Sequence, residues 1–147
     1  MKPSKLITRT RNILLAVFTI AMVFSISSCA TKAKFAVSTV APAARGDIKV
    51  TTDKNNNYKI KIEILNLAEV ERLQPARKSY VVWLVTDNFE TKNIGRITST
   101  TGTFSKKLKA SFETVTSYKP AKIFITTEDD ADVSYPGTQV VLSTDTF

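Results

Sequence analysis

The chain of 147 residues contains no histidine, and this absence excludes several kinds of chemistry. Histidine is the usual general base of enzymes and the commonest metal ligand in proteins. Without it, Ser-His-Asp catalysis, Cys-His catalysis and an ordinary zinc site are ruled out by composition. We therefore expect a protein that is not an enzyme and that has no catalytic residue, no bound cofactor and no metal ion.

Cysteine is scarce as well, because Cys29 is the only one. A single cysteine cannot form a disulfide within the chain, so stability must come from the hydrophobic core. The residues before it follow a recognisable order. A basic segment without acids, residues 2–11, precedes an apolar run from Ile13 to Ile26. This run is shorter than the ~20 residues needed to span a bilayer and is typical of a secretory signal peptide.

The residues Ile26, Ser27, Ser28 and Cys29 resemble the lipobox of bacterial lipoproteins. The resemblance implies cleavage between Ser28 and Cys29 and acylation of the Cys29 thiol with palmitate-type chains. Two or three acyl chains give stable anchoring, whereas one chain binds a membrane reversibly. Ala30, rather than Asp, follows the cysteine. By resemblance to sorted lipoproteins, this favours the outer membrane, with the domain facing the periplasm.

Three other interpretations of this segment remain open. In the first, Cys29 is an ordinary small residue beside an uncleaved membrane anchor. In the second, the segment is a plain secretory signal that is cut elsewhere. In the third, it is a buried core helix, although a helix that is apolar all round and preceded by basic residues suits a small soluble domain poorly.

Cleavage before Cys29 would change the charge of the protein. Residues 1–28 contain four basic residues and no acid, so their removal lowers the net charge from +8 to +4. A modest positive charge favours contact with anionic lipid headgroups or glycans. No arginine-rich run is present, so nucleic acid is not an expected partner. The expected partners are membrane lipid, through acylated Cys29, and an envelope protein.

The chain is expected to have three parts, namely a signal peptide (1–28), a lipidated N-terminus with a flexible tether (29–46) and a β-sandwich domain (47–147). The tether is rich in Ala, Thr, Lys, Ser, Val and Pro and shows no hydrophobic period. Alternatively, Phe35, Val37 and Val40 would add a first edge strand to the domain.

Beyond residue 46, apolar and polar residues alternate with the period of a β-strand. About seven strands are predicted, with turn residues between them, which is typical of an all-β sandwich. They lie at residues 48–51, 58–64, 79–86, 93–99, 104–112, 120–128 and 138–144. Residues 66–78 form the one plausible helical or irregular connection, and residues 100–103 are expected to be a turn.

Short motifs in the second half of the chain resemble the extracytoplasmic C-terminal domain of anti-sigma-K factors. They are Tyr80 to Leu84, Gly95, Phe124 to Glu128, Pro136-Gly137 and Val140 to Leu142. The resemblance implies an immunoglobulin-like antiparallel β-sandwich that acts as an interaction or structural module. Few residues precede the apolar segment, so sigma-factor inhibition is not implied. The alternative function is an extracytoplasmic accessory of an anti-sigma-type system with an uncleaved anchor.

Four residues of the predicted domain are expected to have structural roles. Tyr80 and Trp83 are interpreted as sandwich anchors that bury large rings and need a partner for their polar atoms. Gly95 and Gly137 are interpreted as backbone positions in turns or bulges.

The densest acidic group contains Glu128, Asp129, Asp130 and Asp132. Hard cations such as calcium require several converging carboxylate oxygens. The spacing matches no complete calcium loop, and an acidic hairpin tip that keeps the protein soluble explains the group as well. Elsewhere, carboxylates such as Glu63 and Glu113 show no pairing that the sequence reveals, and a hydrolase that uses carboxylates only is the third and most distant alternative function.

A second charged group is basic, and its members are Lys106, Lys107, Lys109, Lys119 and Lys122. One interpretation of these lysines is a patch across two neighbouring strands that faces a membrane or glycan. A solvated sheet edge protected by lysines explains them equally well.

Overall fold

A computed structural model describes residues 30–102 and 105–147. The predicted signal peptide, its cleavage position at Ser28 and Cys29 itself lie outside the described residues. The described residues form nine strands and one short 3-10 turn. The elements are β1 (Ala30–Lys34), β2 (Arg45–Thr52), β3 (Tyr58–Leu65), η1 (Val70–Arg72), β4 (Ser79–Thr86), β5 (Thr91–Ile97), β6 (Ser99–Gly102), β7 (Ser105–Thr116), β8 (Pro120–Glu128) and β9 (Val140–Ser143).

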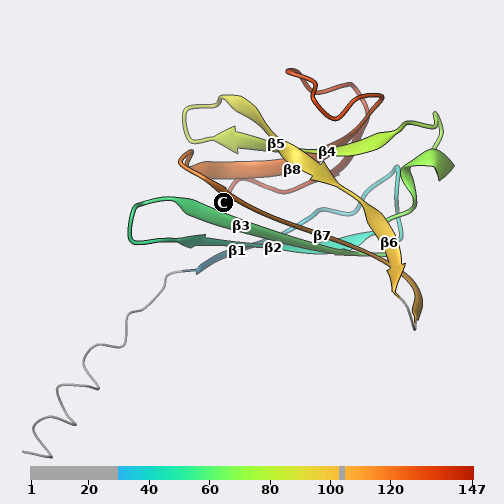
Figure 1. The fold of residues 1–147 in the computed structure, drawn as a ribbon, viewed down its shortest axis with the longest axis horizontal. Helices are drawn as coiled ribbons and strands as arrows, with labels where there is room; N and C mark the ends of the chain where they lie inside the picture. Colours follow the sequence, from blue (N-terminus) through green and yellow to red (C-terminus); the bar gives the residue numbers. More distant parts are fainter. Residues whose placement is uncertain (1–29, 103–104) are drawn as a thin grey trace, which may run out of the picture.

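The strands form two antiparallel sheets that lie face to face (Figure 1). The five-stranded sheet has the order β1-β2-β3-β7-β6, and the four-stranded sheet has the order β5-β4-β8-β9. The predicted all-β sandwich is therefore confirmed. The orders β2-β3-β7-β6 and β5-β4-β8-β9 correspond to strands A-B-E-D and C′-C-F-G of immunoglobulin domains. Strand β1 is an addition beside the first of these.

Alternation along the strands places the core between the two sheets. Along β3, Ile60, Ile62 and Ile64 are fully buried, while the lysines and the glutamate between them are exposed. The opposite sheet contributes side chains of the same kind to this core, namely Tyr80, Val82, Leu84, Ile123 and Ile125. Apolar burial of this kind is the main favourable term in folding.

The expectation of a flexible tether is wrong for residues 30–46. Strand β1 pairs with β2, from Ala30 opposite Thr51 to Lys34 opposite Asp47. Immediately after β1, the Phe35 ring is buried with 8% of its surface exposed. The chain then reaches the other sheet, because Phe35 forms a bridge with Thr144 in addition to donating its N–H to Gly46. The alternative of an edge strand is right in kind but not in position, because β1 ends at Lys34, before Phe35, Val37 and Val40.

Residues 66–78 form an irregular connection, one of the two forms expected for them, and contain the 3-10 turn η1 and a cis Gln74–Pro75 bond. The predicted turn at residues 100–103 differs from the structure. Where a turn was expected at residues 100–103, strand β6 begins at Ser99, because the chain leaves β5 in one sheet and enters the other sheet within two residues. Within residues 30–102 and 105–147, no helix is long and apolar enough to cross a membrane.

We predict that Phe35→Ala destabilises the protein by about 3–5 kcal/mol, because it leaves a cavity where the two sheets meet. The matched control is Val37→Ala, since Val37 is 71% exposed and little should change there. Urea unfolding followed by tryptophan fluorescence measures both variants. Equal stability of the two variants would show that residues 30–44 are not part of the folded domain.

Candidate functional site

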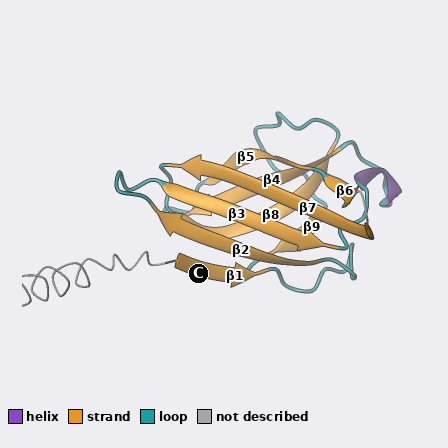
Figure 2. Ribbon diagram, turned by 60° about the horizontal axis from the view of Figure 1, so that its bottom comes forward, coloured by secondary structure: helices purple, strands orange, loops and turns teal. Residues whose placement is uncertain are grey.

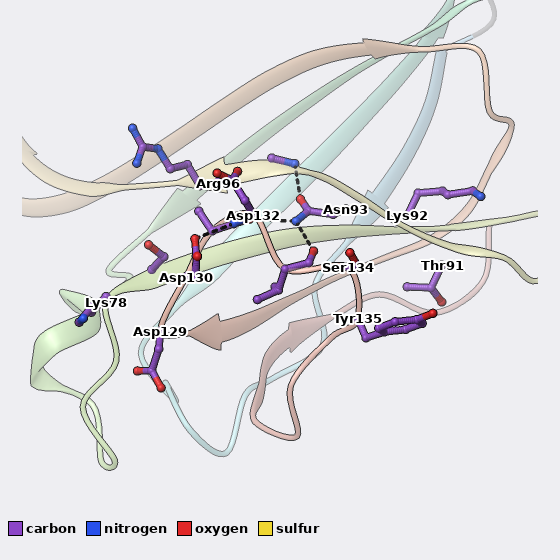
Figure 3. Close-up of a pocket in the computed structure, with 14 residues that line it drawn as sticks. Lys78, Thr91, Lys92, Asn93, Arg96, Asp129, Asp130, Asp132, Ser134 and Tyr135 are labelled. Atoms are coloured by element: carbon purple, nitrogen blue, oxygen red, sulfur yellow. Dashed lines mark hydrogen bonds between the residues drawn. The ribbon is translucent and has the colours of Figure 1, made fainter.

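A groove of about 1180 Å³ lies on the outer face of the four-stranded sheet. One wall is β5, and the other is the loop of residues 129–139 that joins β8 to β9. Figure 3 shows the groove with Asn93 at its centre and Tyr135 and Lys78 toward its two ends. The loop containing the predicted acidic group thus forms one side of the groove.

Trp83 is a buried residue on the same side of the four-stranded sheet as the groove. It is fully buried, but it lies on the side of β4 that points away from the core between the sheets. Its ring stacks on Phe124 with centroids 6.2 Å apart, and its Nε1–H donates to Thr126 Oγ1 at 2.8 Å. The predicted polar partner therefore exists, although Trp83 packs under the loop rather than between the sheets.

Tyr80 is the anchor that does lie between the sheets. Its hydroxyl donates to the carbonyl oxygen of Ala68 at 2.8 Å, which satisfies its polar atom. Burial raises the pKa of the Tyr80 hydroxyl, and the negative charge of Glu71 raises it further. Tyr80 is thus held in its neutral form as a structural residue.

Glu128 closes the loop at its base through a buried hydrogen-bond chain. The hydroxyl of Thr126 donates to the Glu128 carboxylate, and the Gly137 N–H donates to the same oxygen at 2.7 Å. A Cβ atom at Gly137 would lie only 2.7 Å from the second carboxylate oxygen. A larger residue at this position would have to displace the Glu128 carboxylate from its hydrogen bonds, so the close approach, rather than a turn, favours glycine here.

Asn93 holds the middle of the loop against β5. Its side-chain amide donates to the carbonyl oxygens of Ala131 and Val133, each at 2.9 Å (Figure 3). The side-chain oxygen Oδ1 of Asn93 accepts a hydrogen bond from the Gly95 N–H at 3.0 Å. Gly95 has a φ of 134° at an irregularity in the pairing of β4 and β5, which confirms the predicted bulge glycine.

The acidic residues of the loop do not converge on a common point. Glu128 faces the loop base, and Asp129 forms an ion pair with Arg77. Asp130 accepts the backbone N–H of Asp132 at 3.0 Å. Figure 3 shows Asp129 pointing away from Asp132. No group of three or more metal-ligating side chains occurs among the residues that the structure describes.

The predicted basic patch across two neighbouring strands is wrong. Lys109 lies on β7 in the five-stranded sheet, whereas Lys122 lies on β8 in the four-stranded sheet. Lys119 lies in the turn between them and pairs with Asp87 at 3.7 Å. The side chains of Lys106 and Lys107 lie outside the described part of the structure.

Glu63 and Glu113 are each paired with a lysine on the outer face of the five-stranded sheet. Glu63 contacts Lys61 and Glu113 contacts Lys59, each at 2.7 Å. The hydrogen bond from Lys61 lowers the pKa of Glu63. A carboxylate kept ionised in this way lacks the raised pKa of a catalytic acid.

The groove is suited to a polar partner with charges of both signs. Asp130 and Asp132 supply negative charge, and Lys78 and Arg96 supply positive charge along the same groove. Tyr135 lies beside them with 84% of its surface exposed. Aromatic and arginine side chains of this kind are enriched at protein interfaces.

The sequence interpretation did not identify Asn93, Arg96 or Tyr135 as site residues. For Tyr135 a signal is present, because a large aromatic ring stands between acidic residues and a Pro-Gly pair in a predicted loop. Arg96 and Asn93 give no such signal, since their role depends on the loop that folds over β5.

Comparison with known proteins gives no relative, since no protein-family model, curated protein or solved structure matches this chain. The geometry of the groove and the resemblance of residues 26–29 to a lipobox are therefore the basis for a functional argument.

We predict that Asn93→Ala loosens the loop, because two carbonyl groups lose their donor. Amide hydrogen exchange in residues 129–136 should become several-fold faster, while stability should fall by about 1–2 kcal/mol. Asn88→Ala, in the exposed turn between β4 and β5, is the matched control. Unchanged exchange in the Asn93 variant would mean that the Glu128 network alone holds the loop.

Proposed function

We propose that this protein is a lipid-anchored envelope lipoprotein whose β-sandwich is a non-catalytic interaction module. Acylated Cys29 would hold it at the outer membrane on the periplasmic side, and the groove beside β5 would bind an envelope protein. The observation that carries the interaction role is the open groove with exposed Tyr135 and charges of both signs.

The anchor is supported by the sequence around Cys29. A basic segment, an apolar run and a lipobox-like ending occur in the order that lipoprotein processing requires. The first strand begins at Ala30, so a folded domain follows the cysteine directly. Such a domain would remain close to the membrane surface.

The interaction role is supported by how firmly the groove is built. Asn93, Glu128 and the Arg77–Asp129 ion pair all fix the loop against the sheet. A groove with fixed walls loses little conformational entropy when a partner binds. The exposed ring of Tyr135 adds a large contact area at the rim.

The N-terminus of the protein purified from bacterial membranes provides the first test. We predict a mass that corresponds to cleavage before Cys29 plus two or three acyl chains. Cys29→Ser is the control and should lose both the acyl mass and the cleavage. An intact Met1 would contradict the lipoprotein proposal and favour the accessory of an anti-sigma-type system with an uncleaved anchor.

Crosslinking in intact cells provides the second test. With a photoreactive amino acid at Tyr135, we predict a discrete crosslinked product that is reduced in the presence of Arg96→Glu. The same amino acid at Val37, which is also largely exposed to solvent but does not line the groove, should give no such product. Equal products from both positions would contradict a binding role of the groove.

A further inference from the structure

The outer face of the five-stranded sheet carries an excess of positive charge. Its acidic side chains are Asp47, Glu63 and Glu113. Its basic side chains are Lys32 and Lys34 on β1, Arg45 and Lys49 on β2, Lys59 and Lys61 on β3, and Lys109 on β7. Among the side chains that the structure describes, this face therefore has seven basic and three acidic residues, an excess of +4.

Three of these lysines stand in one row across three strands. Lys32 lies opposite Lys49, and Lys49 lies opposite Lys61. Like charges that face each other directly across a sheet destabilise it. Lys61 is paired with Glu63, but no ion pair of Lys32 or Lys49 occurs within the described residues. The row therefore costs stability in the free protein and suits a negatively charged partner.

The surface is hollowed where this row runs. A depression of about 480 Å³ is lined by four lysines and two carboxylates of β1, β2 and β3, namely Lys32, Lys34, Lys49, Lys61, Asp47 and Glu63. Lysine ammonium groups on flexible stems around such a depression can reach an anionic group from several sides. The charge is thus combined with a concave surface.

The chain enters the domain at the edge of this same face. Ala30 lies in register with Thr51 and Lys59, so it shares a face with the lysines of β1, β2 and β3. Figure 2 shows the sheet from this side, with β1 at its edge. Cys29 is the preceding residue in the sequence, about 3.8 Å away along the backbone.

We propose that the outer face of the five-stranded sheet lies on an anionic bilayer, with the Lys32–Lys49–Lys61 row against acidic phospholipid headgroups. This inference rests on the proposed lipid anchor, which would bring the face to the membrane. In this orientation, the groove beside β5 faces away from the bilayer, because it lies on the outer face of the other sheet. Its acidic loop is thereby kept away from the anionic surface.

One end of the domain is an alternative membrane contact. The turns between β4 and β5 and between β7 and β8 carry Phe89, which is 89% exposed, and Tyr118, and they are joined by the Lys119–Asp87 ion pair. A domain standing on this end would insert the two rings and leave the lysine face in solvent. The charges near these turns are paired, so this end gives no attraction specific to anionic lipid.

The test uses the full chain purified from bacterial membranes and reconstituted into vesicles of phosphatidylcholine alone or mixed with phosphatidylglycerol. Lysine labelling read by mass spectrometry should show several-fold protection of Lys32 and Lys49 in the mixed vesicles only. High salt should remove the protection, because it screens exposed charges. Lys122, on the opposite sheet, should label equally in both vesicles.

Lysine-to-glutamine variants test whether the lysine row binds the membrane, as distinct from stabilising the fold. Lys32→Gln with Lys49→Gln should abolish the protection of Lys34 and Lys61 without loss of stability, because each lysine removed weakens the attraction to the anionic membrane about fivefold. Lys54→Gln, in the turn between β2 and β3, is the matched control and should leave the protection unchanged. Equal labelling in the two kinds of vesicle, or protection of Lys54 and Lys119 instead, would overturn the proposal.

The same spectra report the N-terminal peptide, so the anchor and the face are tested separately. An intact Met1 with protected Lys32 and Lys49 would refute acylation and support the lysine face. Acylated Cys29 without protection of Lys32 and Lys49 would support acylation and refute the lysine face. If the protein is recovered with neither acylated Cys29 nor an intact Met1, it is tested by sedimentation with the same vesicles. Binding to the anionic vesicles alone would then support the lysine face as the membrane contact.

Discussion

The strict alternation of buried and exposed residues along β2 and β3 is the constraint on which both faces of the five-stranded sheet depend. Ile48 lies opposite Ile62, and in the next position Lys49 lies opposite Lys61. Successive side chains of a strand point to opposite faces, so a slip of one residue would bring lysines into the core. The register of β2 and β3 that places isoleucines in the core therefore also places lysines side by side on the outer face.

Much of the sandwich is predictable from the sequence because local rules act there without competition. Period-two alternation identifies β3, and an apolar run on both faces identifies β4 as a central strand. The turn between β2 and β3 follows from its residue types. Asp53 accepts the backbone N–H groups of Asn55 and Asn57, which also lowers the pKa of its carboxyl group.

The rest depends on contacts between distant parts of the chain. In β1, only Thr31 and Ala33 lie in register with the buried Val50 and Ile48, and Thr31 is itself exposed, so no hydrophobic period marks β1 as a strand. Trp83 belongs to a strand that is apolar on both sides, and nothing in that pattern shows that a loop covers its outer face. The lysines of β7 and β8 are close in sequence but lie in different sheets.

The start of β1 at Ala30 has a mechanical consequence. With an anchor at Cys29, any pull between the membrane and a partner in the groove enters the domain through the pairing of β1 with β2. A force along the strands loads these hydrogen bonds together, whereas a force across them breaks them one after another. Beyond β1, the bridge from Phe35 to Thr144 passes the load to the sheet that carries the groove. With Cys29 anchored, the edge strand would thus be the force-bearing element between the membrane and the groove.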